Sequence, residues 1–184
     1  MKIATTLALI AVLFTACGPA GAQSRQVKDE FEVTGFTAID ASVVATIRIT
    51  QAPTAKVTAE GSEALLNLLD VRMENDKLVL TMGDRRHGKK KRQSEKLLIS
   101  ISTPTLTKID SDGVGNIEIE GAFTTPELTI DSEGVGNITA HNLDAGSLYI
   151  SSEGVGNITL GGKADKVEIK SEGVGNVNTG ELIA

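Results

Sequence analysis

Apolar and polar residues alternate along most of the chain, and in its second half one heptad recurs within this alternation at regular intervals. The heptad reads Ser, then Asp or Glu, then Gly, Val, Gly, Asn, and finally Ile or Val. Its four copies occupy residues 111–117, 132–138, 152–158 and 171–177. They begin 21, 20 and 19 residues apart, and an isoleucine lies two residues before each. Alternation with a period of two is typical of β-strands, and a unit repeated at this interval is typical of a repeat architecture.

A repeat of about 20 residues has room only for short strands and tight corners. Gly, Asn, Asp, Pro and Ala, which favour corners, lie between the heptads. We therefore predict an all-β fold, a right-handed parallel β-helix or solenoid with coils of about 20 residues, the regular repeats running over 106–184. Each coil should stack about 4.8 Å above the previous one, and the rule for parallel crossovers gives the handedness. The Leu/Asn pattern and helical arm of a leucine-rich repeat, which has a similar period, are missing.

Two orientations of the heptad are compatible with its sequence. Strict alternation turns the Ser and both glycines inward and exposes the acidic residue, the Val and the Asn, whereas a turn centred on Gly would bury Val and Asn. An upstream segment, 39–50, favours the first orientation, because 39–49 aligns with 130–140 without a gap and its inward positions are all apolar. These inward positions are Ile39, Ala41, Val43, Ala45, Ile47 and Ile49. We therefore expect a degenerate coil at 39–50 and an outward Val and Asn in every copy.

The outward positions are the candidate contact residues for a macromolecular partner. The acidic positions are Asp112, Glu133, Glu153 and Glu172; the valines are Val114, Val135, Val155 and Val174; the asparagines are Asn116, Asn137, Asn157 and Asn176. The bland interpretation is a solvated charge stripe beside a ladder of amides that hydrogen-bond one another. The functional interpretation is a contact surface, because an exposed apolar stripe is more than scattered surface hydrophobes. The spacing is not that of calcium-binding nonapeptide repeats, so no metal site is predicted.

Further strands are expected at 55–60, 71–74, 78–82 and 97–102, with one or two helical turns over 62–69 capped by Ser62. A basic loop is expected at 84–96. It contains Arg85, Arg86, Lys89, Lys90, Lys91, Arg92 and Lys96. From residue 97 onward the chain contains four Lys and 13 Asp or Glu, a net charge of −9. The net charge of −6 for the whole chain therefore combines a basic loop with a strongly acidic column.

The basic loop is either a solvated insertion or a site that attracts acidic lipid headgroups, envelope polysaccharide or the acidic column of a neighbouring molecule. Aromatic residues make up only 3% of the chain and none lies among these charges. Because base stacking needs aromatic side chains, and because the chain is acidic overall, no binding of nucleic acid is expected.

The first 22 residues are typical of an export signal, because Lys2 is their only charge and a 12-residue, mostly apolar stretch follows it. Two cleavage sites compete: a lipoprotein-type site that would lipidate Cys17, and ordinary cleavage after Ala22. Residues 23–32 would then form a polar tether, and 33–184 the folded domain. If Cys17 is acylated, the chain is anchored to a membrane without spanning it.

This layout resembles the head GIN domain family of putative auto-transporter adhesins over about residues 33–184. The resemblance rests on the repeated Ser-x-Gly-x-Gly-Asn segments, the opening at 35–39, and the strand segments 78–80 and 97–99. It implies an exported bacterial β-solenoid protein, often a lipoprotein, located in the cell envelope at the outer membrane, in the periplasm or on the surface. The acidic residue before the first Gly departs from the family pattern. Family members generally have further coils, so an open last coil here predicts a truncated chain or cover by another chain, for example a homo-oligomer.

No catalytic constellation is evident. His87 lies in the basic loop and His141 in a corner, neither beside a nucleophile, and Cys17 is the only cysteine. The Gly-Val-Gly-Asn segment lacks the third glycine, the lysine and the following helix of nucleotide loops. We therefore expect a non-catalytic, adhesin-like envelope module without a cofactor, whose partner is an envelope polysaccharide or protein. The alternatives are a carbohydrate-active solenoid enzyme and an assembly unit that stacks end to end.

Overall fold

The computed structural model describes residues 26–83 and 96–183 and confirms the all-β prediction, with one short helix. The strands are β1 (Gln26–Phe31), β2 (Ala38–Ser42), β3 (Val44–Gln51), β4 (Lys56–Ser62), β5 (Leu69–Glu74), β6 (Lys77–Met82), β7 (Leu98–Thr103), β8 (Lys108–Ser111), β9 (Val114–Ser132), β10 (Val135–Ser152), β11 (Ile158–Ser171) and β12 (Val177–Ile183). The helix α1 (Glu63–Leu66) starts where expected, because Ser62 Oγ accepts the backbone N–H of Leu65 at 3.3 Å. Cys17 and most of the basic loop (84–95) lie outside the described residues.

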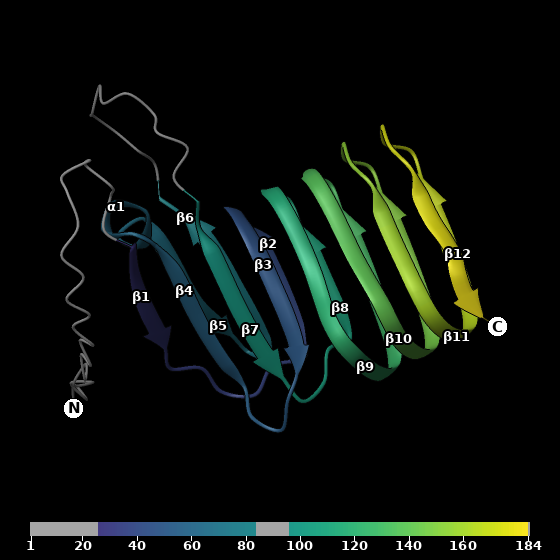
Figure 1. The fold of residues 1–184 in the computed structure, drawn as a ribbon, viewed down its shortest axis with the longest axis horizontal. Coiled ribbons are helices and arrows are strands. Elements are labelled where there is room, and N and C mark those ends of the chain that lie inside the picture. Colours follow the sequence, from purple (N-terminus) through teal and green to yellow (C-terminus); the bar gives the residue numbers. More distant parts are fainter. Residues whose placement is uncertain (1–25, 84–95, 184) are drawn as a thin grey trace, which may run out of the picture.

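The heptad copies pair in parallel, each with the next, and Figure 1 shows their strands side by side along the long axis. Equivalent positions stand opposite one another, so that Ile138 is paired with Ile117 in β9 and with Ile158 in β11. Unequal repeat lengths are absorbed by register shifts just after the heptads, at Ala140 in β10 and Thr159 in β11. The copies therefore remain in register although their spacing varies from 19 to 21 residues. We call each set of equivalent positions a column.

The predicted degenerate coil joins the same stack. Strand β2 pairs in parallel with β8, and β3 pairs in parallel with β9. The register places Ile39 opposite Ile109 and Val44 opposite Val114, as the alignment of 39–49 with the repeats requires. The heptad columns thus include residues of this segment.

The first half of the chain corrects two predictions. Residues 26–31 of the expected tether form β1, which pairs antiparallel with β4, and β4 pairs antiparallel with β7. Val27 and Phe31 are partly buried against the core, which favours a strand over a free tether. Strands β5 and β6 form an antiparallel hairpin across Asn75 (φ 58°) and Asp76, because a two-residue connection joins only antiparallel strands. Parallel coils of about 20 residues therefore do not extend through the whole domain.

The core consists of aliphatic columns that run through the stack. Ile39, Ile109 and Ile130 are fully buried in one such column. The last member, Ile169, is 43% exposed, because the second half of β11 pairs only with β10 within the described residues. Each added strand therefore buries the apolar positions of the strand before it.

Candidate binding face

The valines of the heptads point outward, as strict alternation predicts. Val114 and Val135 are each 49% exposed, Val155 is 50% and Val174 is 72% exposed. Val44, which the sequence analysis left out of the candidate set, is 61% exposed and pairs with Val114, so it begins the same column. The alignment of 39–49 with the repeats is the signal that could have identified it. These five valines form what we call the valine stripe.

The second glycine of each heptad explains why the backbone turns its neighbours outward. Gly136 has a φ of +155°, and its equivalents lie between +148° and +156°, a region that residues with a side chain rarely adopt. A Cβ on Gly136 would overlap the carbonyl oxygen of Gly115 in the preceding copy. The copies can therefore stack at strand spacing only where this position lacks a side chain. This constraint leaves the Val and Asn on either side of the glycine to form the surface.

The asparagines form a hydrogen-bonded ladder. The backbone N–H and the Nδ2 of Asn137 both donate to Asn116 Oδ1, at 3.2 and 3.1 Å. Asn157 repeats this arrangement on Asn137 Oδ1, at 3.1 and 3.2 Å. Asn176 does so on Asn157 Oδ1, at 3.1 Å from its backbone N–H and 3.5 Å from its Nδ2. The amides thus bind backbone groups of the next copy, which supports the structural interpretation of this column.

Replacing Asn157 by alanine should lower the free energy of unfolding by about 1–2 kcal/mol, because the backbone N–H of Asn176 loses its acceptor. Asn176→Ala is the matched control, since it removes only the 3.5 Å donation and keeps that backbone N–H paired. Urea denaturation of the two variants measures the difference. Equal losses of stability would contradict a role for the ladder.

The acidic column is exposed along its whole length, as predicted. Lys170 Nζ lies 3.2 Å from Glu172 Oε1 and 3.5 Å from Glu153 Oε1. The hydrogen bond to Glu172, followed by that to Glu153, raises the pKa of the Lys170 ammonium above its usual value. Asp112 and Glu133 have no ion-pair partner within the described part of the chain. Their charges are therefore available to a cationic group of a partner.

A second acidic column, missed by the sequence analysis, runs one residue before the heptad serines. It consists of Asp40, Asp110 and Asp131, which pair across β2, β8 and β9. Lys77 Nζ lies 3.2 Å from Asp40 Oδ2, and Lys108 Nζ lies 2.8 Å from Asp110 Oδ1 and 3.2 Å from Asp131 Oδ2. The hydrogen bond to Asp110, the largest cause, raises the pKa of Lys108. Lysines thus neutralise this column, unlike the first two members of the heptad column.

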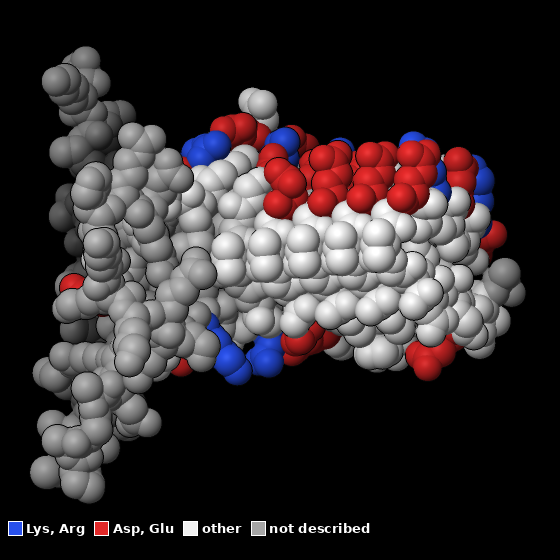
Figure 2. All heavy atoms as spheres, turned by 90° about the horizontal axis from the view of Figure 1, so that it is seen from above, with Lys and Arg blue, Asp and Glu red and all other residues white. Residues whose placement is uncertain are grey.

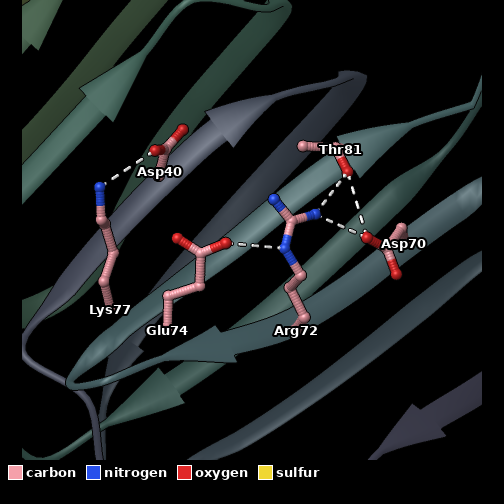
Figure 3. Close-up of polar contacts among 6 residues, drawn as sticks. All are labelled: Asp40, Asp70, Arg72, Glu74, Lys77 and Thr81. Atoms are coloured by element: carbon pink, nitrogen blue, oxygen red, sulfur yellow. Dashed lines mark hydrogen bonds and ion pairs between the residues drawn. The ribbon is translucent and has the colours of Figure 1, made fainter.

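The β5–β6 hairpin also carries a neutralised cluster (Figure 3). Arg72 Nη1 donates to Asp70 Oδ2 at 2.7 Å, and Arg72 Nε donates to Glu74 Oε1 at 2.9 Å. These bonds, the one to Glu74 first, raise the pKa of Arg72. The acidic residues of this hairpin are therefore engaged within the chain.

The geometry offers no assembled metal centre among the residues that the structure describes. No three His, Cys, Asp or Glu side chains of this part of the chain are grouped so that they could hold a metal ion. His141 Nδ1 lies 3.6 Å from Glu181 Oε2, and both side chains are exposed. Within 26–83 and 96–183, no helix is long and apolar enough to cross a membrane.

The family model described as "putative auto-transporter adhesin, head GIN domain" matches residues 35–184, which include every strand from β2 to β12. The chain belongs to this family. The match confirms the resemblance seen in the heptads, and membership of an adhesin family indicates a surface or exported protein. No curated protein matches this head GIN domain chain.

Solved structures of similar proteins share the fold. A putative adhesin from Bacteroides fragilis is 31% identical, with a TM-score of 0.80 over 87% of this chain and 73% of that chain. A putative adhesin from Parabacteroides distasonis is 16% identical, with a TM-score of 0.71 over 84% of this chain and 66% of that chain. A putative lipid binding protein from the same organism is 17% identical, with a TM-score of 0.67 over 85% and 74%.

The columns of this head GIN domain combine three kinds of contact on one regular surface. Figure 2 shows the molecule from above, with the stack running from left to right, and a row of acidic side chains lies beside a broad uncharged band. The valine stripe carries exposed apolar side chains, the acidic column carries carboxylates, and the Asn column carries side-chain amides.

Proposed function

We propose that this chain is a non-catalytic, adhesin-like module of the cell envelope that binds a macromolecular partner through the repeated Glu-Val-Asn face. Residues 106–184 would form coils of a right-handed parallel β-helix, which hold that face straight. The observation that carries the proposal is the valine stripe, in which five equivalent valines are 49–72% exposed. Isolated exposed valines are ordinary, but a regular apolar row on a soluble surface is typical of an interaction site.

The composition of the face supports a protein partner. Saccharides have little apolar surface to cover a row of valine methyl groups, whereas an extended or helical peptide segment can place apolar side chains along it. Asp112 and Glu133, unpaired in the described chain, would attract basic residues at the edge of such a segment. The charges steer and orient the partner, and the apolar row supplies most of the affinity.

Export would bring the module to this partner. The apolar segment at 1–22 supports cleavage of a signal sequence, and Cys17 directly after a small residue supports a lipid anchor. The basic residues of 84–96 would then lie close to anionic lipid headgroups.

Replacing Val135 and Val155 by lysine should abolish capture of the partner from envelope extract by the intact mature chain. Two ammonium groups in the middle of the stripe cannot be buried without a large desolvation cost. Proteins retained by the immobilised chain are identified by mass spectrometry, and the partner is the protein retained by the wild type but not by this variant.

The matched control is the double variant Thr139→Lys and Thr159→Lys. These threonines face outward one strand position beyond the heptads of the same two copies, so the variant has the same added charge in the same coils. It should retain the partner. Equal loss in both variants would indicate a general charge effect, and equal retention in both would refute the proposed face.

A further inference from the structure

A hollow of about 490 Å³ lies over the first part of the sheet, where β1, β4, β7, β3 and β9 are neighbours in that order. None of its lining residues belongs to the Glu-Val-Asn face. It is lined by Lys28, Glu30, Arg48, Thr50, Lys56, Thr58, Ser100, Ile101, Ser102 and Glu120. We call it the polar trough. Its volume falls in the range of about 300–1,000 Å³ that is usual for ligand sites.

The floor of the polar trough consists of four short hydroxyl side chains on three strands, arranged as two staggered pairs. The strand register places Thr58 of β4 opposite Ser100 of β7, and it places Ser102 of β7 opposite Thr50 of β3. Most neighbours of these residues along their strands, Ile49, Val57, Ala59, Ile99 and Ile101, are buried in the core, so alternation turns the hydroxyl side chains to the outer face. Because these side chains are short and those around them are long, the surface is hollow here.

Thr58 is the most informative residue of this floor. It is only 8% exposed, yet its hydroxyl has no hydrogen-bond partner within the described chain. The hydroxyl oxygen is not sealed off, since no buried side-chain oxygen or nitrogen of the described residues lacks a partner. The adjacent Thr50 and Ser102 differ, because their hydroxyls donate to the carbonyl oxygens of Ile101 and Thr54 at 3.4 and 3.1 Å. A deeply set but accessible hydroxyl without a partner is a group that a polar ligand would satisfy.

Charged residues of both signs form the two walls. On one side Glu30 Oε2 lies 2.9 Å from Lys56 Nζ, and Lys28 of β1 stands beside them without an ion-pair partner in the described chain. On the other side Arg48 Nε lies 3.3 Å from Glu120 Oε1. Glu30, Thr58, Ser100 and Arg48 follow one another across the neighbouring strands β1, β4, β7 and β3. Glu30 and Arg48 are therefore three strand spacings apart, about 14 Å. The trough is wide enough for a sugar ring lying flat on the floor.

We propose that the polar trough binds a saccharide. A saccharide hydroxyl both donates and accepts, so it can pair with the carboxylates and cations of the walls and with the hydroxyls of the floor. An apolar ligand would make few favourable contacts, because almost no apolar side chain lines the trough. A simple anion would be repelled by the carboxylates of Glu30 and Glu120 in the walls. Lys28 adds a free cation, which suits a sugar carboxylate. This site is independent of the Glu-Val-Asn face, and its failure would leave the proposed function intact.

Titration of the intact mature chain with maltotriose, cellotriose, chitotriose and trigalacturonate tests this inference, with heat release as the readout. At least one trisaccharide should bind saturably. The double variant Thr58→Val and Ser100→Ala keeps the shape of the floor but removes the two floor hydroxyls that have no hydrogen-bond partner within the described chain, and it should weaken that binding roughly tenfold. If trigalacturonate is the only trisaccharide that binds, a sugar carboxylate contacts Lys28. Lys28→Gln should then weaken the binding of trigalacturonate further.

Thr159→Val is the control, because it makes the same substitution on an outward position of β11, far along the stack from the trough. It should leave the affinity unchanged. Thermal melting checks that each variant is folded. The inference is overturned if no trisaccharide binds at millimolar concentration, or if the trough variant and the Thr159→Val control bind equally well. The valine-to-lysine variant of the other face should bind the trisaccharide like the wild type.

Discussion

Replacing Gly136 by alanine is expected to lower the free energy of unfolding by about 2–6 kcal/mol, because two separate costs combine. At a φ of +155° an alanine is strained, which costs about 1–3 kcal/mol. The added methyl group also overlaps the backbone carbonyl oxygen of Gly115 in the preceding copy, and overpacking of this kind costs about 1–3 kcal/mol. Urea denaturation followed by circular dichroism measures the loss.

Gly35→Ala is the matched control for this substitution. A Cβ at Gly35 meets no atom within 4 Å, and the backbone there does not lie in the left-handed region. Its stability should equal that of the wild type or exceed it slightly, because alanine restricts the unfolded chain more than glycine does. A Gly136→Ala protein as stable as Gly35→Ala would mean that the copies do not stack with their glycines in contact.

Replacing Ile130 by alanine should lower the free energy of unfolding by about 2–5 kcal/mol, the usual cost of a cavity in a packed core. Ile130 is fully buried between the isoleucines of the neighbouring copies. The same substitution at Ile169, which is 43% exposed in the same column, should cost only about 1 kcal/mol. The two midpoints of urea denaturation should therefore be clearly separated.

This pair of variants tests the register of the stack as well as its core. Both residues lie two positions before a heptad and differ only in whether a further strand covers them. Similar losses at both positions would show that Ile169 is covered in solution, which analytical ultracentrifugation would reveal as self-association. A small loss at Ile130 would contradict the packing of the column itself.

The stacked half of the fold could be predicted from the sequence because its information is local and repeated. The gap-free alignment of 39–49 with 130–140 predicted the register in which β2 and β3 pair with the repeats and the outward valines, and Ser62 marked the start of the short helix. Four copies of one heptad reveal a column as soon as two are superimposed. The candidate face follows directly from that register.

The antiparallel strands of the first half could not be predicted in this way. In β1 the half-buried positions are Val27, Asp29 and Phe31, so the polar Asp29 interrupts the apolar alternation in the sequence. The pairing partner β4 lies some 30 residues away, so the register depends on contacts that no repeat marks. The polar trough could not be predicted from the sequence either, because Thr58, Ser100 and Thr50 become neighbours only when three strands of unrelated sequence pair. The contact between Lys108 and Asp131 likewise joins two different strands, β8 and β9.

The register shifts just after the heptads have a consequence for how this domain can change in evolution. The register shifts at Ala140 and Thr159 absorb a difference of one residue in repeat length. A duplicated segment therefore need not have the same length as its neighbours to continue the stack. A gene duplication or deletion of one unit would thus add or remove one row of Glu, Val and Asn while leaving the other rows as they are. The length of the Glu-Val-Asn face can therefore vary between relatives without any new type of residue.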